Sequence, residues 1–145
     1  MKEYVDIGFR IKKINDLLLK KADEQMQEMN LTFSQHHILI YLIHCENHIS
    51  TLKAIEHKFH VSQATMAGIV KRMEEKQIVS SYISPTDRRI KLVELTDKGY
   101  EICEKSKIMM ERSEKKMRSL YSSEEMKQFD LYLDRLYSAL SKEEE

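Results

Sequence analysis

The apolar pattern of this 145-residue chain departs from a helical period in one stretch only, residues 78–95. Elsewhere apolar residues recur at every third or fourth position, which is the spacing of amphipathic helices. Within the stretch, residues 78–83 and 90–95 are short runs typical of two strands. Only three glycines and one proline are available to interrupt helices. We therefore expect a mostly α fold with a small β-hairpin.

Capping residues and helical periodicity together predict six helices. Ser or Thr stands where the first backbone N–H groups of a helix need an acceptor, at Thr32, Ser62, Thr96 and Ser122 or Ser123. The helices are expected over about residues 4–29, from Thr32 onward, over 51–59, 63–77 and 97–119, and from Ser122 onward. In the fourth, Met66, Ile69, Val70 and Met73 would be buried.

The compartment follows from what the sequence lacks. No apolar run approaches the roughly 20 residues that a membrane-spanning helix needs. The first residues are acidic where a secretory signal would be basic, and the two cysteines form no CxxC pair. We expect a cytoplasmic protein with no membrane partner.

Equal numbers of basic and acidic residues, 24 of each, conceal an uneven distribution. Residues 53–91 hold eight basic and four acidic side chains, a local net charge of plus four. Residues 1–52 hold six basic and seven acidic side chains, and residues 92–145 hold ten and thirteen. The central excess favours an attraction to a phosphate backbone.

A helix, a short turn, a second helix and a two-stranded hairpin with a basic tip form the order of a winged helix-turn-helix. The second helix suits the width of a DNA major groove, and the small polar residues at its start can approach base edges. Gly68 permits a close approach of the helix backbone to DNA or to another helix. The DNA-binding candidates on this helix are Ser62, Gln63, Thr65, Lys71 and Arg72, with Gln63 suited to adenine and the two cations to phosphates.

Residues 62–74 and 87–99 resemble the MarR family of bacterial transcription regulators. The second segment has the family's wing pattern, which is Asp, any residue, Arg, five residues, Leu and Thr, beginning at Asp87. The order of long helix, helix-turn-helix, wing and two long helices covers essentially the whole chain.

The resemblance implies a homodimer that binds double-stranded DNA at a pseudo-palindromic operator. It implies that Arg89 enters the minor groove and that Asp87 holds it by an ion pair. Arg88 and Lys91 would contact phosphates or support these charges. Gln77 departs from the family, which usually has Gly at this left-handed helix end.

Three segments follow from the resemblance and the long amphipathic helices. Residues 1–30 and 97–145 are expected to form interlocked dimerisation helices, and residues 31–96 the winged helix-turn-helix. Two chains would cover more of the apolar helix faces than one chain can. The resemblance also implies a repressor released by a small aromatic or amphipathic effector. Weak candidates to line its pocket are Tyr4, Phe9, Ile11 and Tyr41.

Other functions have less support in the sequence. Six histidines between His36 and His60 suggest a metal-responsive regulator, but they lack a full ligand pattern. Cys45, expected to be buried, and Cys103, beside acidic residues, suggest a redox-responsive one. A helical adaptor that binds protein instead of DNA is a third alternative. No enzyme motif is present, so no catalytic residue, metal site or cofactor is assigned.

Overall fold

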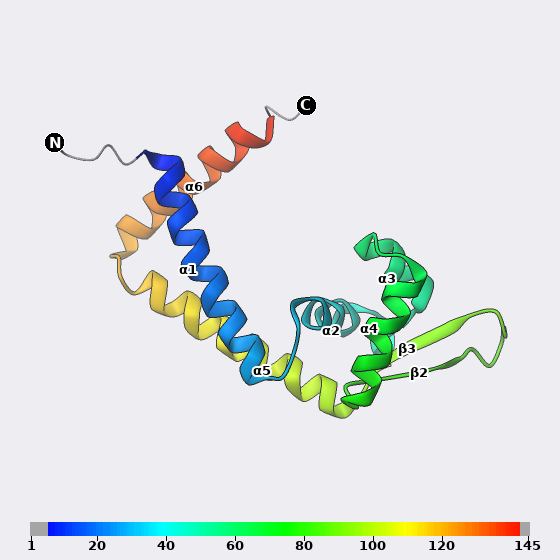
Figure 1. Cartoon of the computed structure of the whole chain (residues 1–145). Helices are drawn as coiled ribbons and strands as arrows, with labels where there is room; N and C mark the ends of the chain where they lie inside the picture. The colour runs from blue at the N-terminus through cyan, green and yellow to red at the C-terminus, as the bar shows by residue number, and fades with distance from the viewer. Residues whose placement is uncertain (1–5, 143–145) are drawn as a thin grey trace. The chain divides into compact units, whose positions relative to one another are not determined.

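The computed structural model describes residues 6–142, and these residues form helices and one small sheet (Figure 1). The elements are α1 (Ile7–Glu28), α2 (Phe33–His44), a 3-10 turn η1 (Glu46–His48), β1 (Ile49–Thr51), α3 (Leu52–Phe59), α4 (Gln63–Glu75), β2 (Val79–Ile83), β3 (Lys91–Leu95), α5 (Asp97–Arg118) and α6 (Ser123–Lys142). The predicted fold class and six helices are confirmed. The chain forms two compact units, up to Lys105 and from Ser106 onward.

The predicted caps explain where the helices begin. Thr32 and Gln35 form a capping box, in which Oγ1 of Thr32 accepts from the Gln35 amide and Oε1 of Gln35 accepts from the Thr32 amide, both at 3.2 Å. Oγ1 of Thr96 accepts from the Gly99 amide at 3.1 Å. Ser122 and Glu125 cap α6 in the same reciprocal way. Asp6 caps α1, which therefore begins at Ile7, and residues 4 and 5 lie outside the described residues.

The core of the first unit lies between α2, α3, α4 and the sheet. Leu39, Leu42, Ile55, Met73 and Val93 are fully enclosed there. Burying a side chain of this size stabilises the fold by about 1.5 to 3 kcal/mol relative to exposure. The predicted inner face of α4 is confirmed in full, since all four of its expected residues are buried. The opposite face of α4 is thereby turned to solvent.

The sheet has three antiparallel strands in the order β1-β3-β2, one more than expected. The extra strand, β1, pairs with β3 through Ser50 opposite Val93. It is only three residues long and ends at Thr51, which also caps α3. Three residues are too few to show the alternation of apolar and polar side chains that predicts a strand. The strand with which β1 pairs also lies more than 40 residues further along the chain. Its pairing joins the base of the hairpin to the connection between α2 and α3.

The end of α4 is tied to the beginning of two other helices. The ammonium of Lys76 donates to the carbonyl oxygen of Asn30 at 2.6 Å and to Oε1 of Gln35 at 2.7 Å. The next residue, Gln77, has a φ of 62°, and its carbonyl accepts from the Thr96 hydroxyl at 2.7 Å. The left-handed helix end expected at Gln77 is therefore present without a glycine.

Gly99 allows α5 to begin close to Ile78, the residue before strand β2. A methyl group at this position would overlap the carbonyl oxygen of Ile78 and lie 2.8 Å from Cδ1 of Leu95. The glycine is required here for close packing.

The second unit contains the end of α5 and all of α6. Arg118 pairs with Glu114 at 2.6 Å and with Asp130 at 3.1 Å, and the rings of Tyr121 and Phe129 stack with centroids 5.4 Å apart. Within the described residues, α6 has no buried side chain. The division into dimerisation helices (1–30 and 97–145) and a winged helix-turn-helix (31–96) stays a prediction. Across residues 6–142, no helix is long and apolar enough to cross a membrane.

Candidate nucleic-acid interface

The first turn of α4 presents small polar side chains to solvent. His60 ends α3 in a left-handed conformation, with a φ of 52°, so that the chain turns sharply into α4. Oγ of Ser62 accepts from the Thr65 amide at 3.3 Å and donates to the Thr65 hydroxyl at 3.0 Å. Gln63 is exposed between them. The Ser62 hydroxyl thus caps the start of the helix, while the Gln63 side chain is exposed.

The exposed face of α4 continues through Gly68 to Lys71 and Arg72. A methyl group at Gly68 would meet only Nη1 of Arg72, at 3.6 Å. No other helix of the described chain lies within 4 Å of this position, and the expectation that Gly68 permits close approach of DNA or of another helix stays a prediction.

The tip of the hairpin holds an arginine in a fixed orientation. Nε and Nη2 of Arg89 donate to the two carboxylate oxygens of Asp87, each at 3.1 Å, and the Arg89 amide donates to Oδ1 at 3.0 Å. These hydrogen bonds lower the pKa of the Asp87 carboxyl group below its ordinary value. The Arg89 side chain is still 90% exposed. The predicted ion pair is present, and it orients the guanidinium without burying it.

A shallow hollow of about 360 Å³ joins the hairpin tip to the helix-turn-helix. It gathers Gln63, Arg89 and Lys91, three candidates from separate segments of the sequence. It also contains Lys53 at the start of α3, which sequence reasoning counted among the basic residues but did not assign to the site. The remaining lining residues are Thr51, Leu52, Glu56 and Ile90. Three cations face one carboxylate here, so the surface attracts anions.

The hairpin is fixed to α4 by a carboxylate. Oε1 of Glu74 accepts from the Ser81 amide at 2.8 Å and also from the Ser81 hydroxyl. Lys71 and Arg72 precede Glu74 by three and two residues, and Arg88 is exposed at the hairpin tip. These hydrogen bonds connect the helix that carries Lys71 and Arg72 to the hairpin that carries Arg88 and Arg89.

Comparison with known sequences identifies the family. A sequence model of the MarR family matches residues 31–91. The uncharacterized HTH-type transcriptional regulator YdgJ of Bacillus subtilis is 33% identical over 123 residues, which are 85% of this chain and 72% of that protein. The chain belongs to the MarR family.

Solved structures agree with the fold of this MarR-family chain. A mutant of Staphylococcus aureus MepR matches with a TM-score of 0.87 and 24% identity, covering 94% of this chain and 99% of that one. A complex of MepR with DNA matches with a TM-score of 0.81 and 24% identity, covering 92% and 98%. At this identity the likeness concerns the winged helix fold.

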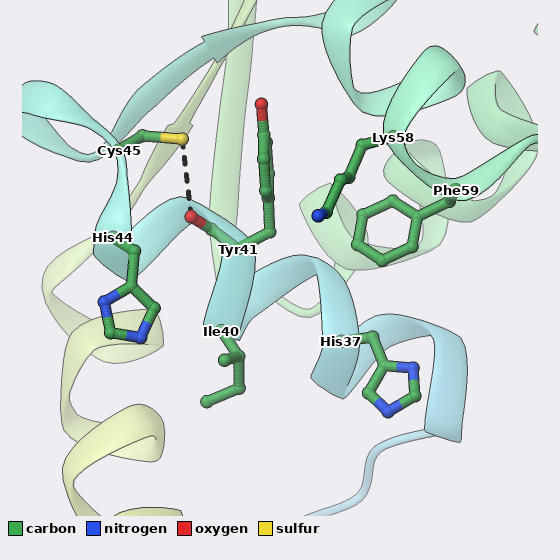
Figure 2. Close-up of a pocket in the computed structure, with 7 residues that line it drawn as sticks. All are labelled: His37, Ile40, Tyr41, His44, Cys45, Lys58 and Phe59. Carbon is green, nitrogen blue, oxygen red and sulfur yellow. Dashed lines mark hydrogen bonds between the residues drawn. The ribbon is translucent and has the colours of Figure 1, made fainter. Parts of the chain in front are cut away.

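Another hollow of this MarR-family chain lies between α2 and α3, and we call it the α2–α3 pocket (Figure 2). It is lined by His37, Ile40, Tyr41, His44, Cys45, Lys58 and Phe59. Of the weak candidates for an effector pocket, Tyr41 is part of it. Phe9 and Ile11 are exposed on α1 and line neither hollow, and Tyr4 lies outside the described residues.

The metal and redox alternatives gain no support from the geometry. Among residues 6–142 no group of three or more His, Cys, Asp or Glu side chains is placed to hold a metal ion. Cys45 is half-exposed, which corrects the expectation that it is buried, because α2 ends at His44 and the thiol reaches the pocket. It donates to the Tyr41 carbonyl at 3.3 Å. Burial and the nearby Glu104 raise the pKa of the Cys103 thiol to about 11, so it stays protonated.

Proposed function

We propose that this MarR-family chain is a cytoplasmic, sequence-specific DNA-binding transcriptional regulator. It binds a pseudo-palindromic operator as a homodimer and acts as a repressor released by a small effector. The observation that carries the proposal is the single surface that combines the exposed start of α4 with the oriented Arg89. A helix with a free polar face fits the major groove, and an arginine on a projecting hairpin fits the narrower minor groove.

The distribution of charge supports DNA as the partner. Lys53, Lys71, Arg72, Arg88 and Lys91 are exposed on the same unit, and none of them has an ion pair among the described residues. Their charges are free to replace counterions on phosphates. The related fold of MepR is found in complex with DNA, which is consistent with this use of the surface.

The exposed apolar faces of the long helices support the homodimer. On α1 the exposed large apolar residues include Ile7, Phe9, Ile11, Ile14, Leu17 and Leu18. On α6 they include Leu131, Tyr132, Leu133, Tyr137 and Leu140, and Tyr137 is 76% exposed. Large exposed apolar surfaces on a protein mark interaction sites. A second copy of the chain is the partner that presents the same faces, and two-fold dimers are the commonest soluble assembly.

A salt titration tests the proposed function. Purified protein is titrated with the DNA upstream of its own gene at about 50 and about 200 mM salt, where six to ten phosphate contacts predict a loss of roughly 10³ to 10⁵ in affinity. Arg112→Ala, an exposed arginine of α5 that is not among the DNA-binding candidates, is the control and should show the same salt dependence as wild type. Affinity that is absent or independent of salt would favour the protein-binding adaptor. A folded monomer at micromolar concentration in light scattering would contradict the homodimer.

A further inference from the structure

The hollow beside the hairpin brings together two lysines from distant parts of the chain. Lys53 belongs to the first turn of α3, two residues after Thr51, which ends β1. Thr51 lies opposite Leu92 of β3, and Lys91 is the residue before Leu92. The pairing of β1 with β3 therefore places both lysines on the walls of one hollow, which we call the α3–hairpin hollow.

The charges of the α3–hairpin hollow leave an excess of one positive charge. Arg89 is balanced by Asp87, to which its guanidinium donates two hydrogen bonds. Lys53 and Lys91 are exposed, and within the described part of the chain neither has an ion pair. Glu56 supplies the carboxylate on the walls. Two unpaired ammonium groups against one carboxylate suit a ligand with a single negative charge.

The hollow lies between the two parts of the site that are proposed to enter DNA grooves. Its walls include Gln63, in the first turn of α4, and Arg89, in the hairpin that extends past α4 (Figure 1). Adjacent major and minor grooves of a duplex are separated by one sugar–phosphate backbone. If Gln63 lies in one groove and Arg89 in the next, this backbone must pass between them, across the hollow.

We propose that the α3–hairpin hollow holds one phosphodiester of the DNA backbone, and that Lys53 and Lys91 both bind it. The inference rests on the proposed DNA-binding function and deepens it by assigning Lys53 and a shared phosphate to the site. A phosphodiester carries one negative charge, which the hollow balances. A phosphate monoester carries about 1.5 to 2 negative charges at neutral pH, and the Glu56 carboxylate opposes the additional charge. The DNA backbone is therefore the ligand that the hollow favours.

Lys53 is a positioning residue for the reading of bases. Contacts to phosphates fix the register and the orientation of a protein on the duplex. A phosphate held between Gln63 and Arg89 determines which base pair faces Gln63 when Arg89 occupies the minor groove. Because this contact involves no base, loss of the Lys53 charge should weaken binding to all sequences alike.

Operator duplexes that carry a single neutral methylphosphonate test the site. The operator is located by footprinting, and each phosphate of one half-site is replaced in turn. Wild-type protein should lose affinity about tenfold when the replaced phosphate is the one in the hollow. Lys53→Met and Lys91→Met should both become insensitive at this same phosphate and stay sensitive at the others, and Lys53→Arg should respond as wild type. Lys58→Met, on the same helix but outside the hollow, is the matched control and should also respond as wild type.

Competition experiments distinguish a backbone phosphodiester from a free phosphate. Glycerol 3-phosphate should displace wild-type protein from the operator no more than chloride does at matched ionic strength. Glu56→Gln removes the opposing carboxylate and should make glycerol 3-phosphate the better competitor. Selective displacement of wild-type protein by glycerol 3-phosphate would overturn the choice of a phosphodiester.

The dependence of operator affinity on salt separates failure of the site from failure of the proposed function. Lys53→Met should reduce the slope of log affinity against log salt by about 0.9, the contribution of one phosphate contact. Salt-dependent binding in which Lys53→Met keeps the wild-type response at every phosphate would overturn the site and leave the proposed function standing. Insensitivity of Lys53→Met and Lys91→Met at two different phosphates would overturn the shared phosphate. A wild-type protein with no affinity for DNA would overturn the proposed function and this inference with it.

Discussion

The ammonium of Lys76 and Oε1 of Gln35 lie 2.7 Å apart, although 41 residues separate them in sequence. The same oxygen caps α2, because it also accepts from the Thr32 amide. Lys76 further donates to the carbonyl of Asn30, two residues after the end of α1, and Lys98 of α5 donates to the Lys76 carbonyl at 2.9 Å. Lys76 therefore joins the end of α4, which carries DNA-binding candidates, to the end of α1 and to the beginnings of α2 and α5.

Loss of this ammonium should destabilise the fold. Lys76→Met keeps most of the stem but removes both hydrogen bonds, and we expect the free energy of unfolding to fall by about 1.5 to 3 kcal/mol, the range for a hydrogen bond to a charged group. Lys71→Met on the same helix is the matched control, because Lys71 is exposed and should change stability by less than about 0.5 kcal/mol. Urea unfolding measures both. Equal stability of the two variants would contradict the role of Lys76.

A glycine at residue 77 should stabilise the protein. Gln77 adopts a φ of 62°, a conformation that costs a residue with a Cβ roughly 1 kcal/mol and costs glycine almost nothing. Gln77→Gly should therefore raise the free energy of unfolding by about 0.5 to 1 kcal/mol. Gln128→Gly within α6 is the control and should lower it by about 1 kcal/mol. A loss of stability in both variants would show that Gln77 carries no strain.

Local structure was predictable from the sequence, and distant pairing was not. The cap at Thr32 and the buried face of α4 follow from neighbours within one or two turns, which a single segment of sequence contains. The strand β1 depends on β3, whose Val93 lies opposite Ser50. The bond from Lys76 to Asn30 spans 46 residues. Such contacts are decided by how the helices pack, and no periodicity of one segment encodes them.

In the candidate site, too, local contacts were predictable from the sequence and distant ones were not. The hydrogen bonds between Asp87 and Arg89 connect residues two apart, and the family pattern already paired them. Lys53 joins the same hollow only because the start of α3 folds against the hairpin. Lys58 and Phe59 likewise meet Tyr41 from another helix, so the α2–α3 pocket had no signal in sequence beyond Tyr41 itself.

The two cysteines should react at very different rates. Burial raises the pKa of the Cys103 thiol to about 11, with a further contribution from Glu104, whereas Cys45 is half-exposed. Iodoacetamide should alkylate Cys45 in folded protein and Cys103 only after unfolding. Mass spectrometry of labelled wild-type and Cys45→Ala protein measures this. Rapid labelling of Cys103 in the folded variant would contradict its burial.

The Cys103 thiol makes the free energy of unfolding depend on pH in the alkaline range. The pKa of Cys103 is higher in the folded chain than its ordinary value of 9.0, so the folded state holds the proton more tightly. Its contribution to stability is complete below about pH 9 and is lost as the pH rises toward about 11. Cys103→Ala should be less sensitive to pH over this interval in urea unfolding. If the free energy of unfolding of Cys103→Ala changed with pH as steeply as that of wild type, the Cys103 thiol would not be the source of the pH dependence.

Gln63 should determine a base preference. Its exposed amide can pair with adenine through two hydrogen bonds, so Gln63→Ala should relax the preference at one position of each half-site by about 1 to 3 kcal/mol. Binding to a set of operators that differ at single positions measures the effect. Ala67, also exposed on α4, offers the control Ala67→Ser, which should leave the preference as in wild type. An unchanged preference in Gln63→Ala would remove its base-reading role.

Arg89 should respond to the shape of DNA more than to its sequence. Narrow A·T-rich minor grooves concentrate negative potential, so Arg89→Ala should weaken binding most at operators with A·T-rich flanks. Asp87→Asn keeps the arginine but removes the carboxylate that orients it, and should cause a smaller loss with the same dependence on the flanks. Arg88→Ala is the neighbouring control, expected to weaken binding to all flanks alike. Competition binding with matched A·T-rich and G·C-rich flanks decides between these outcomes. Equal losses on both flanks for Arg89→Ala would reduce its role to a phosphate contact.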